Sequence, residues 1–186
     1  SLWPALAPAQ TLILNASPSA QPGEAVNLQG HFSAAAQPFL AAGATGPAQP
    51  LPVLVQSPGQ LTVQLPASLP LDLYQLWVED QGQRSPRVPV NRARVMHFDS
   101  PDITPGGSLR LFGRNLRLGA ATPTVRFVPA EGGSGGGPAT VELAQSDAYC
   151  LRVTAPASLV PGTRYELLVS NGAGASAGEV RAEQSV

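Results

Sequence analysis

Short runs in which apolar and polar residues alternate recur along the whole chain. In LTVQL (61–65) leucine and valine alternate with threonine and glutamine, and in LRVT (151–154) they alternate with arginine and threonine. A period of two predicts β-strands that bury one face and leave the other in water. Further runs of strand length, separated by proline and glycine clusters, are TLILN, AVNLQG, LPVLV and YQLWV in the first half and VMHF, SLRLFG, TVRFV, TVEL and YELLVS in the second. The chain is therefore predicted to be all-β.

The composition favours strands and turns over helices. Among 186 residues there are 20 prolines and 19 glycines, which break or weaken helices, while 43% of the residues are hydrophobic, as a folded chain requires. The one cysteine, Cys150, excludes an intrachain disulfide. No apolar run approaches the roughly 20 residues of a membrane-spanning helix, so no membrane span is expected.

A repeat organises the chain. SPSAQPGEAVNLQG (17–30) and SPDITPGGSLRLFG (100–113) share Ser-Pro, Pro-Gly, two apolar positions and a final glycine. LTVQLPASLPLDLYQLWV (61–78) is echoed by LRVTAPASLVPGTRYELLV (151–169), with the tyrosines of the two copies aligned. The offset between the copies grows along the chain, which indicates an insertion in the second copy at the glycine-rich stretch EGGSGGGP (131–138), an expected flexible loop.

The repeat predicts two modules, residues 1–91 and 92–186. Each has about seven short strands and a turn every 8 to 12 residues, as in the immunoglobulin-like class of β-sandwich. The strand that follows Pro-Gly should point Leu28 into the core of the first module and Leu111 into the core of the second. We therefore expect two tandem immunoglobulin-like β-sandwich domains.

Three motifs in the second module carry a likeness to a known family. They are PGGSLRLFGRNL (105–116), YCLRVTAP (149–156) and PGTRYELLVSNGAG (161–174). They resemble the IPT/TIG branch of immunoglobulin-like domains, and in particular the tandem modules that precede right-handed β-helix polysaccharide lyases and glycoside hydrolases in secreted bacterial enzymes. The first module departs from this pattern, with GHF at 30–32 in place of GRNL and VEDQG at 78–82 in place of VSNGAG. The resemblance implies a secreted or cell-surface bacterial protein with a catalytic domain, a polysaccharide lyase or glycoside hydrolase, in the same full-length chain.

No residue pattern in this chain supports catalysis, a metal site or a cofactor. The glycine stretches do not match the phosphate-binding loop, which ends in a lysine, and all basic residues of this chain are arginines. His31 and His97 lie in different modules, and His97 is interpreted as a packed or edge residue rather than a ligand. Cys150 is interpreted as a small buried side chain. A calcium site in an acidic turn stays open, although no EF-hand spacing occurs.

Arginines gather in the middle of the chain. Residues 81–126 hold eight arginines and two acids, whereas the whole chain has a net charge of −1. Such a surface suits an acidic polysaccharide, because a guanidinium pairs with a carboxylate in bidentate fashion. The alternative, which we favour on sequence grounds, is that these arginines solvate strand faces and pair with acids of the neighbouring module. In the second module the candidate contact residues for a ligand or a domain are Arg110, Arg114, Arg117 and Arg126.

Trp77 is the candidate contact residue of the first module. If Tyr74, Leu76 and Val78 face the core, Trp77 lies on the opposite face. An exposed tryptophan there could stack on a sugar ring. Packing against the other module or a neighbouring domain is the alternative to which we give more weight.

Three functional hypotheses follow. The leading one is a non-catalytic accessory region of a secreted bacterial carbohydrate-active enzyme, in which the two modules space, stabilise or orient the catalytic domain. The first alternative is a module that itself binds an acidic polysaccharide. The second is a cell-surface adhesion or assembly module that pairs with partners through exposed edge strands. Nucleic-acid binding is not expected, because the net charge is slightly negative and no recognised motif occurs.

Overall fold

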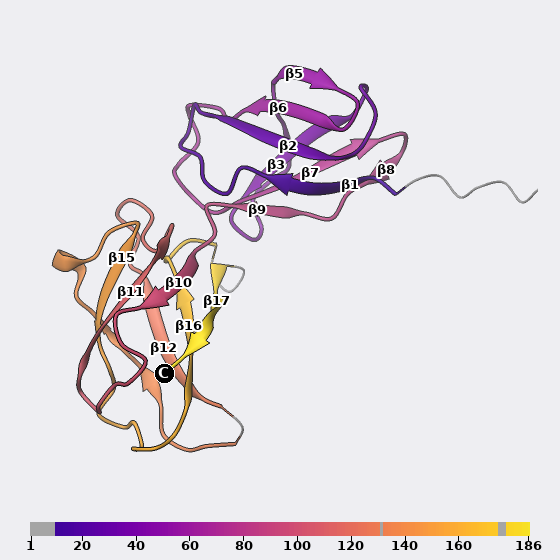
Figure 1. Cartoon of the computed structure of the whole chain (residues 1–186). Helices are drawn as coiled ribbons and strands as arrows, with labels where there is room; N and C mark the ends of the chain where they lie inside the picture. The colour runs from indigo at the N-terminus through magenta and orange to yellow at the C-terminus, as the bar shows by residue number, and fades with distance from the viewer. Residues whose placement is uncertain (1–9, 131, 175–177) are drawn as a thin grey trace, which may run out of the picture. The chain divides into compact units, whose positions relative to one another are not determined.

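The computed structural model describes residues 10–130, 132–174 and 178–186, and almost all of its regular structure is β-strand (Figure 1). The described residues form two compact units. The first contains the chain up to Pro70 together with Tyr74–Val90, and the second contains Leu71–Leu73 together with Asn91–Val186. The assignment of residues 1–91 and 92–186 to two copies of one module stays a prediction.

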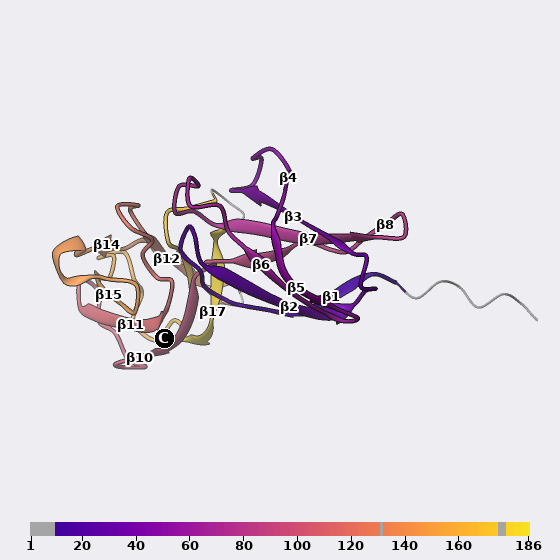
Figure 2. The same cartoon turned by 90° about the horizontal axis from the view of Figure 1, so that it is seen from above.

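The first unit consists of two antiparallel sheets, which appear as two layers in Figure 2. One sheet has the order β1-β2-β6-β5 and the other the order β4-β3-β7-β8, with β9 also paired to β7. The strands are β1 (Leu12–Ala16), β2 (Ala25–His31), β3 (Gln37–Ala42), β4 (Gln49–Pro50), β5 (Val53–Ser57), β6 (Gln60–Gln64), β7 (Tyr74–Asp80), β8 (Gln83–Arg84) and β9 (Val88–Val90).

The second unit repeats this topology. Its sheets have the orders β10-β11-β15-β14 and β13-β12-β16-β17, which follow the orders of the first unit, with the single strand β17 beside β16 where β8 and β9 lie beside β7. The elements are β10 (Arg94–Phe98), β11 (Ser108–Arg114), β12 (Thr124–Pro129), β13 (Gly137–Pro138), β14 (Thr140–Val141), a short 3₁₀ turn η1 (Leu143–Gln145), β15 (Cys150–Thr154), β16 (Tyr165–Ser170) and β17 (Val180–Ser185). This is the strand arrangement of immunoglobulin-like sandwiches, so the predicted fold class is confirmed.

The alternating strands bury their apolar faces between the sheets. Leu28 and Leu61 face each other on β2 and β6, and Leu111 and Leu151 face each other on β11 and β15. All four are fully buried in two separate cores, as the alternation predicts. Each such side chain contributes about 1.5–3 kcal/mol through its removal from water.

The glycine that ends the first repeat motif has a packing role in both units. A Cβ atom on Gly30 would lie 2.0 Å from the Leu12 carbonyl oxygen, and one on Gly113 would lie 1.9 Å from the Arg94 carbonyl oxygen. In each unit the edge strand has a register irregularity directly beside this glycine, in β1 and in β10. The glycine therefore allows the edge strand to approach closely, and β11 continues one residue beyond it.

The predicted insertion in the second unit contributes to a sheet. Glu131 lies outside the described residues, but the stretch EGGSGGGP ends in β13, which pairs with β12. Two of its glycines, Gly135 and Gly136, have positive φ angles of 84° and 90°, which other residues rarely adopt. The insertion thus forms a structured turn into an edge strand.

A tyrosine fixes the entry to the seventh strand of each unit. The hydroxyl of Tyr74 donates to the Pro70 carbonyl at 2.6 Å. The hydroxyl of Tyr165 donates to the Ser134 carbonyl at 2.9 Å and accepts the Val160 N–H at 2.8 Å. Immunoglobulin-like domains use a tyrosine in this position, the tyrosine corner, to tie the chain back onto itself.

The substitution Tyr165→Phe should destabilise the second unit. It removes both hydrogen bonds and leaves a carbonyl and an N–H without their partner, which costs about 1–3 kcal/mol. Urea unfolding followed by circular dichroism measures the loss. Tyr149→Phe is the matched control, because Tyr149 is 68% exposed and its hydroxyl has no hydrogen bond with a described residue. An equal effect of the two substitutions would contradict the role of the tyrosine corner.

Candidate functional site

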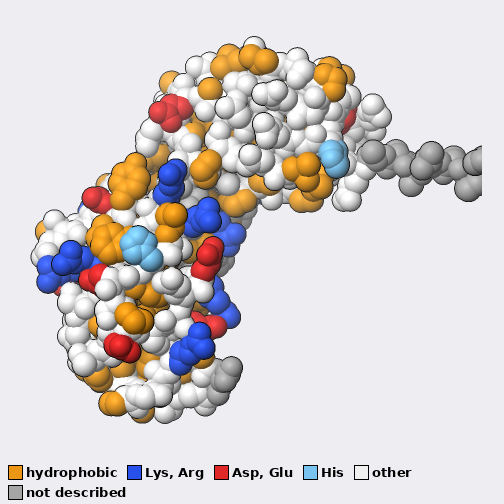
Figure 3. Space-filling view, viewed as in Figure 1, with side chains coloured by type: hydrophobic (Ala, Val, Ile, Leu, Met, Phe, Trp, Pro, Cys, Tyr) orange, Lys and Arg blue, Asp and Glu red, His pale blue; other side chains and the backbone are white. Residues whose placement is uncertain are grey.

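One outer face of the second unit combines aromatic and basic side chains. In β11 the buried residues Leu109 and Leu111 alternate with Arg110, Phe112 and Arg114, which therefore point away from the core. Figure 3 shows a histidine of this unit beside hydrophobic side chains, with basic side chains on either side. We call the outward side of the sheet β10-β11-β15-β14 the arginine face.

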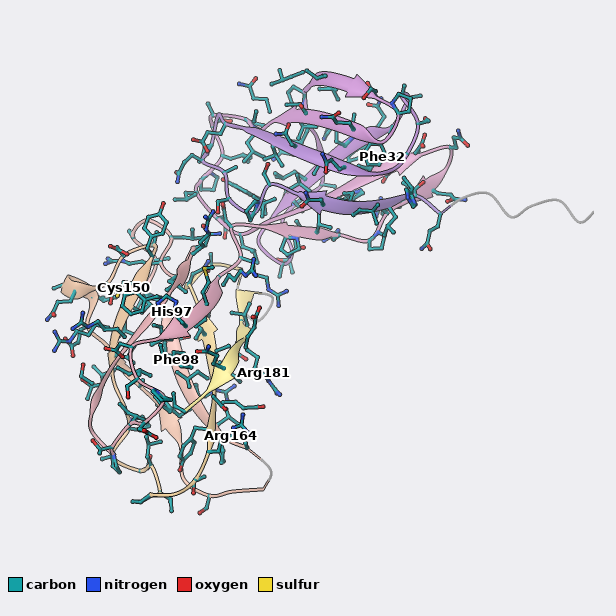
Figure 4. The ribbon with its side chains drawn as sticks, viewed as in Figure 1. Phe32, His97, Phe98, Cys150, Arg164 and Arg181 are labelled. Carbon is teal, nitrogen blue, oxygen red and sulfur yellow. The ribbon has the colours of Figure 1, made fainter. Side chains whose placement is uncertain are left out.

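Cross-strand pairing arranges the arginine face in three rows. The middle row contains His97, Phe112 and Cys150, which are paired across β10, β11 and β15. His97 occupies this row because the register of β10 shifts between Val95 and His97. Figure 4 shows His97 and Cys150 over this sheet. Successive residues on one face of a strand are about 7 Å apart, which sets the spacing of the rows.

The middle row has an aromatic surface. The rings of His97 and Phe112 stack with centroids 4.8 Å apart and an interplanar angle of 16°. His97 is exposed and Phe112 is half-buried, while the neighbouring Met96 is 50% exposed. Rings stacked in this way cover one face of each other, so the surface left open to solvent is the remainder of the exposed His97 ring and of the half-buried Phe112 ring; we call this aromatic pair the platform.

Cys150 differs from its sequence interpretation. It was expected to be buried, but it is only half-buried and it lies on the outward side with Arg152. Desolvation and the nearby Asp147 carboxylate raise the pKa of the Cys150 thiol. The thiol is thus protonated to a greater extent than an ordinary cysteine at neutral pH, and this opposes nucleophilic reactivity.

The row on one side of the platform is neutralised by acids. The Arg110 guanidinium lies 3.6 Å from the Asp99 carboxylate, and the Arg152 guanidinium lies 3.2 Å from the Glu142 carboxylate. Arg110 and Arg152 face each other across β11 and β15. Each arginine of this row therefore has a carboxylate of the second unit as its partner.

The row on the other side lacks such partners. Arg94 and Arg114 face each other across β10 and β11, and both are exposed. Neither guanidinium forms a hydrogen bond or an ion pair with any residue in the described part of the chain. Two like charges directly opposite each other on a sheet repel, so this row is locally unfavourable without an anion.

The remaining two predicted arginines lie elsewhere. Arg117 donates to the carbonyls of Leu143 and Ser146 at 2.9 and 3.0 Å, which ties the loop after β11 to the η1 turn and the residue that follows it. Its Nε atom is buried without a partner among the described residues. Arg126 lies on β12 in the other sheet, 3.5 Å from the Glu179 carboxylate. The four arginines therefore do not form one site.

The expected pairing of arginines with acids of the neighbouring module is wrong for the pairs described above. Arg110 pairs with Asp99, and Arg126 pairs with Glu179, within the same unit. These pairs are exposed, and such pairs contribute about 0–1 kcal/mol each. They hold the side chains in place more than they stabilise the fold.

Trp77 lies on the predicted face of β7 but is not exposed. Its exposed fraction is 0%, so the assumption that the ring is open to a sugar is wrong. Phe39, directly opposite on β3, stacks on it at 5.8 Å between centroids. The guanidinium carbons of Arg84 and Arg87 lie 5.2 and 4.6 Å from the ring centroid. Trp77 is therefore covered by side chains of its own unit, partly through cation–π contacts.

Glu79 completes this cluster. Its carboxylate accepts a hydrogen bond from Arg84 Nε at 2.9 Å and one from the Trp77 indole N–H at 3.3 Å. The hydrogen bond from Arg84 and then that from Trp77 lower the pKa of the Glu79 carboxyl. The carboxylate thus anchors the arginine that covers the tryptophan.

The rest of the described surface offers no grouping typical of a metal centre. Among residues 10–130, 132–174 and 178–186, no three His, Cys, Asp or Glu side chains are placed to hold a metal ion. Within the same residues no helix is long and apolar enough to cross a membrane.

A shallow hollow of the first unit is lined by Thr11, His31, Phe32, Ser33, Asp80, Gln81 and Gln83. In this hollow the Asp80 carboxylate accepts hydrogen bonds from the Ser33 N–H and hydroxyl, at 2.6 and 2.7 Å.

Comparison with known proteins shows structural likeness at low identity. No protein-family model and no curated protein matches the sequence. Similar solved structures include SGBP-B from a complex xyloglucan utilization locus in Bacteroides uniformis (16% identity, 92% of this chain, 48% of that chain, TM-score 0.35). They also include SGBP-B of a mixed-linkage glucan utilization locus in Bacteroides ovatus, in complex with a heptasaccharide (18% identity, 95% of this chain, 44% of that chain, TM-score 0.34). A two-domain fibronectin type-III segment of chicken tenascin is similar as well (16% identity, 92% of this chain, 94% of that chain, TM-score 0.34).

The chain spans about half the length of the two Bacteroides proteins. TM-scores below 0.5 carry no functional information about this chain. The IPT/TIG likeness of the sequence has no counterpart among family models, so that assignment stays a prediction.

Acidification should weaken the first unit through Glu79. Because the pKa of this carboxyl is lowered in the folded state, its ion pair contributes stability above the ordinary carboxyl range and loses it as pH falls through the folded-state pKa. We expect Glu79→Gln to reduce the fall in melting temperature between neutral and acidic pH. Glu183→Gln is the control, since Glu183 is exposed and has no partner among the described residues. Identical pH profiles of wild type and Glu79→Gln would contradict the prediction.

Proposed function

We propose that this chain is a non-catalytic accessory region of a secreted bacterial carbohydrate-active enzyme. In this proposal residues 1–91 and 92–186 are two IPT/TIG-like modules that space, stabilise or orient a catalytic domain in the same full-length chain. The observation that carries it is the repetition of one sandwich topology, each copy with its own core and its own tyrosine corner. A module that folds around its own core can act as a spacer independently of its neighbours.

The surface chemistry supports the same proposal. In the first unit the aromatic and charged side chains of the outer face, Phe39, Trp77, Glu79 and Arg84, are engaged with one another. In the hollow of that unit Asp80 is occupied by Ser33. Side chains engaged in this way serve the shape of the module rather than the conversion of a substrate.

Sequencing the gene on both sides of this segment tests the proposal directly. We expect the reading frame to continue into a domain with the repeat pattern of a β-helix polysaccharide lyase or glycoside hydrolase. The full-length enzyme and a variant lacking residues 10–186 should then share the same kcat on short oligosaccharides, because the reacting groups lie in the other domain. The deletion should lower the thermal stability of the enzyme or its rate on polymeric substrate.

Two results would contradict the proposal. One is a reading frame that holds no carbohydrate-active domain. The other is release of reducing ends or unsaturated uronic acids by residues 1–186 alone from polygalacturonate or alginate. Because catalysis is assigned to a separate domain, the isolated chain is expected to give the same signal as a blank without protein.

A further inference from the structure

We propose that the arginine face of the second unit binds a polysaccharide that contains uronic acids. The sugar ring stacks on the platform of His97 and Phe112, and its carboxylate is held by Arg94 and Arg114. This inference goes beyond the accessory role, because it assigns the chain a ligand of its own and holds whether or not a catalytic domain follows.

The two positive charges of the Arg94–Arg114 row attract an anion. These two side chains face each other in solvent and lack any ion-pair partner among the described residues, whereas Arg84, Arg110, Arg126, Arg152 and Arg181 each have a carboxylate within 4.0 Å. A carboxylate placed between the two guanidinium groups relieves their repulsion. It also accepts the paired N–H groups that make arginine suited to carboxylates.

The neighbouring platform supplies the apolar part of the site. A pyranose ring has an apolar C–H face that packs on an aromatic ring, and the stacked His97–Phe112 pair offers such a surface. The platform and the Arg94–Arg114 row are one step apart on the sheet, about 7 Å. A carboxylate attached to the stacked ring is therefore within reach of the long arginine side chains.

The first unit shows that the framework does not require these residues. Its pairing places Leu12 opposite His31 where the second unit has Arg94 opposite Arg114. Gln29, paired with Asn15 and Gln60, stands where Phe112 is paired with His97 and Cys150. The same sheet is thus built in one unit without arginine or phenylalanine at these positions and in the other with two arginines and Phe112. Structural demand alone does not account for the difference.

The row of Arg110 and Arg152, which acids neutralise, favours a polyuronide over a nucleic acid. Asp99 and Glu142 neutralise Arg110 and Arg152 beside the platform. Only the Arg94–Arg114 row of this face is then left without acid partners among the described residues, and one short cationic row does not provide the extended basic surface that neutralises successive phosphates of a nucleic acid. The carboxylate of one uronic acid needs only a single cationic row beside the ring on which its sugar stacks.

Affinity electrophoresis of the full chain in gels that contain polygalacturonate tests the proposal. We expect retardation that weakens with added salt and a dissociation constant that rises at least about tenfold on Arg94→Leu with Arg114→His, a loss of about 1.4 kcal/mol. These substitutions install the residues of the first unit, which the same framework accommodates. The variants His97→Ala and Phe112→Gln test the platform in the same way.

Arg126→Ala provides the control outside the arginine face. It removes one arginine from the other sheet and should leave retardation unchanged after allowance for its net charge. A neutral glucan gel should retard none of the proteins, and dextran sulfate, which has no carboxylates, or single-stranded DNA should retard the chain less than polygalacturonate does. Tighter binding to DNA or dextran sulfate, an equal effect of Arg126→Ala, or no retardation by polygalacturonate would each overturn the proposal.

Cys150 reports on the location of the ligand. It belongs to the platform row and is the one cysteine of the chain, so its alkylation by iodoacetamide is a footprint of the arginine face. Since the pKa of this thiol is raised, the reaction should be followed at alkaline pH. Bound polygalacturonate should slow the alkylation, and retardation without this protection would place the binding elsewhere. Failure of either test leaves the accessory role intact, because that role is judged from the flanking gene.

Discussion

Each sandwich depends on the packing of apolar side chains between its two sheets, and the other features are arranged around this contact. In β2 and β6, and again in β11 and β15, leucines and valines at every second position point inward and are fully buried. Once these residues are buried, the outward positions are determined as well, because successive side chains of a strand point to opposite faces. The arginine face and the Trp77 cluster both occupy such outward positions.

The shared framework explains why two modules of one topology differ on their surfaces. The glycine beside the edge strand, the tyrosine corner and the buried leucines are common to both units. Outward positions are free of that constraint, so they carry Gln29 in one unit and Phe112 in the other. Difference at these positions is therefore informative about function, whereas similarity inside is informative only about folding.

The Trp77 cluster shows how a module can hold a large aromatic side chain outside its core. Phe39 stacks on the ring, Arg84 and Arg87 cover it, and Glu79 anchors Arg84. Arginine suits this use, because its stem is apolar and its planar guanidinium packs on an aromatic face. The result is a surface that is polar to solvent although a tryptophan lies beneath it.

Alternation, proline and glycine clusters and the internal repeat were enough to predict the fold class, the inward leucines and the outward side of Trp77 and Arg110. These properties depend on neighbours along the chain, since the period of two acts locally. The cover over Trp77, the half-exposure of Cys150 and the acid partners of Arg110 and Arg126 were not predictable. They depend on residues brought together from distant strands, as with Phe39 and Trp77 or Phe112 and Cys150. Sequence by itself thus determined which leucines and valines enter the core, and only the tertiary structure decided what the outward side chains meet, because strand pairing sets neighbours that the order of residues does not contain.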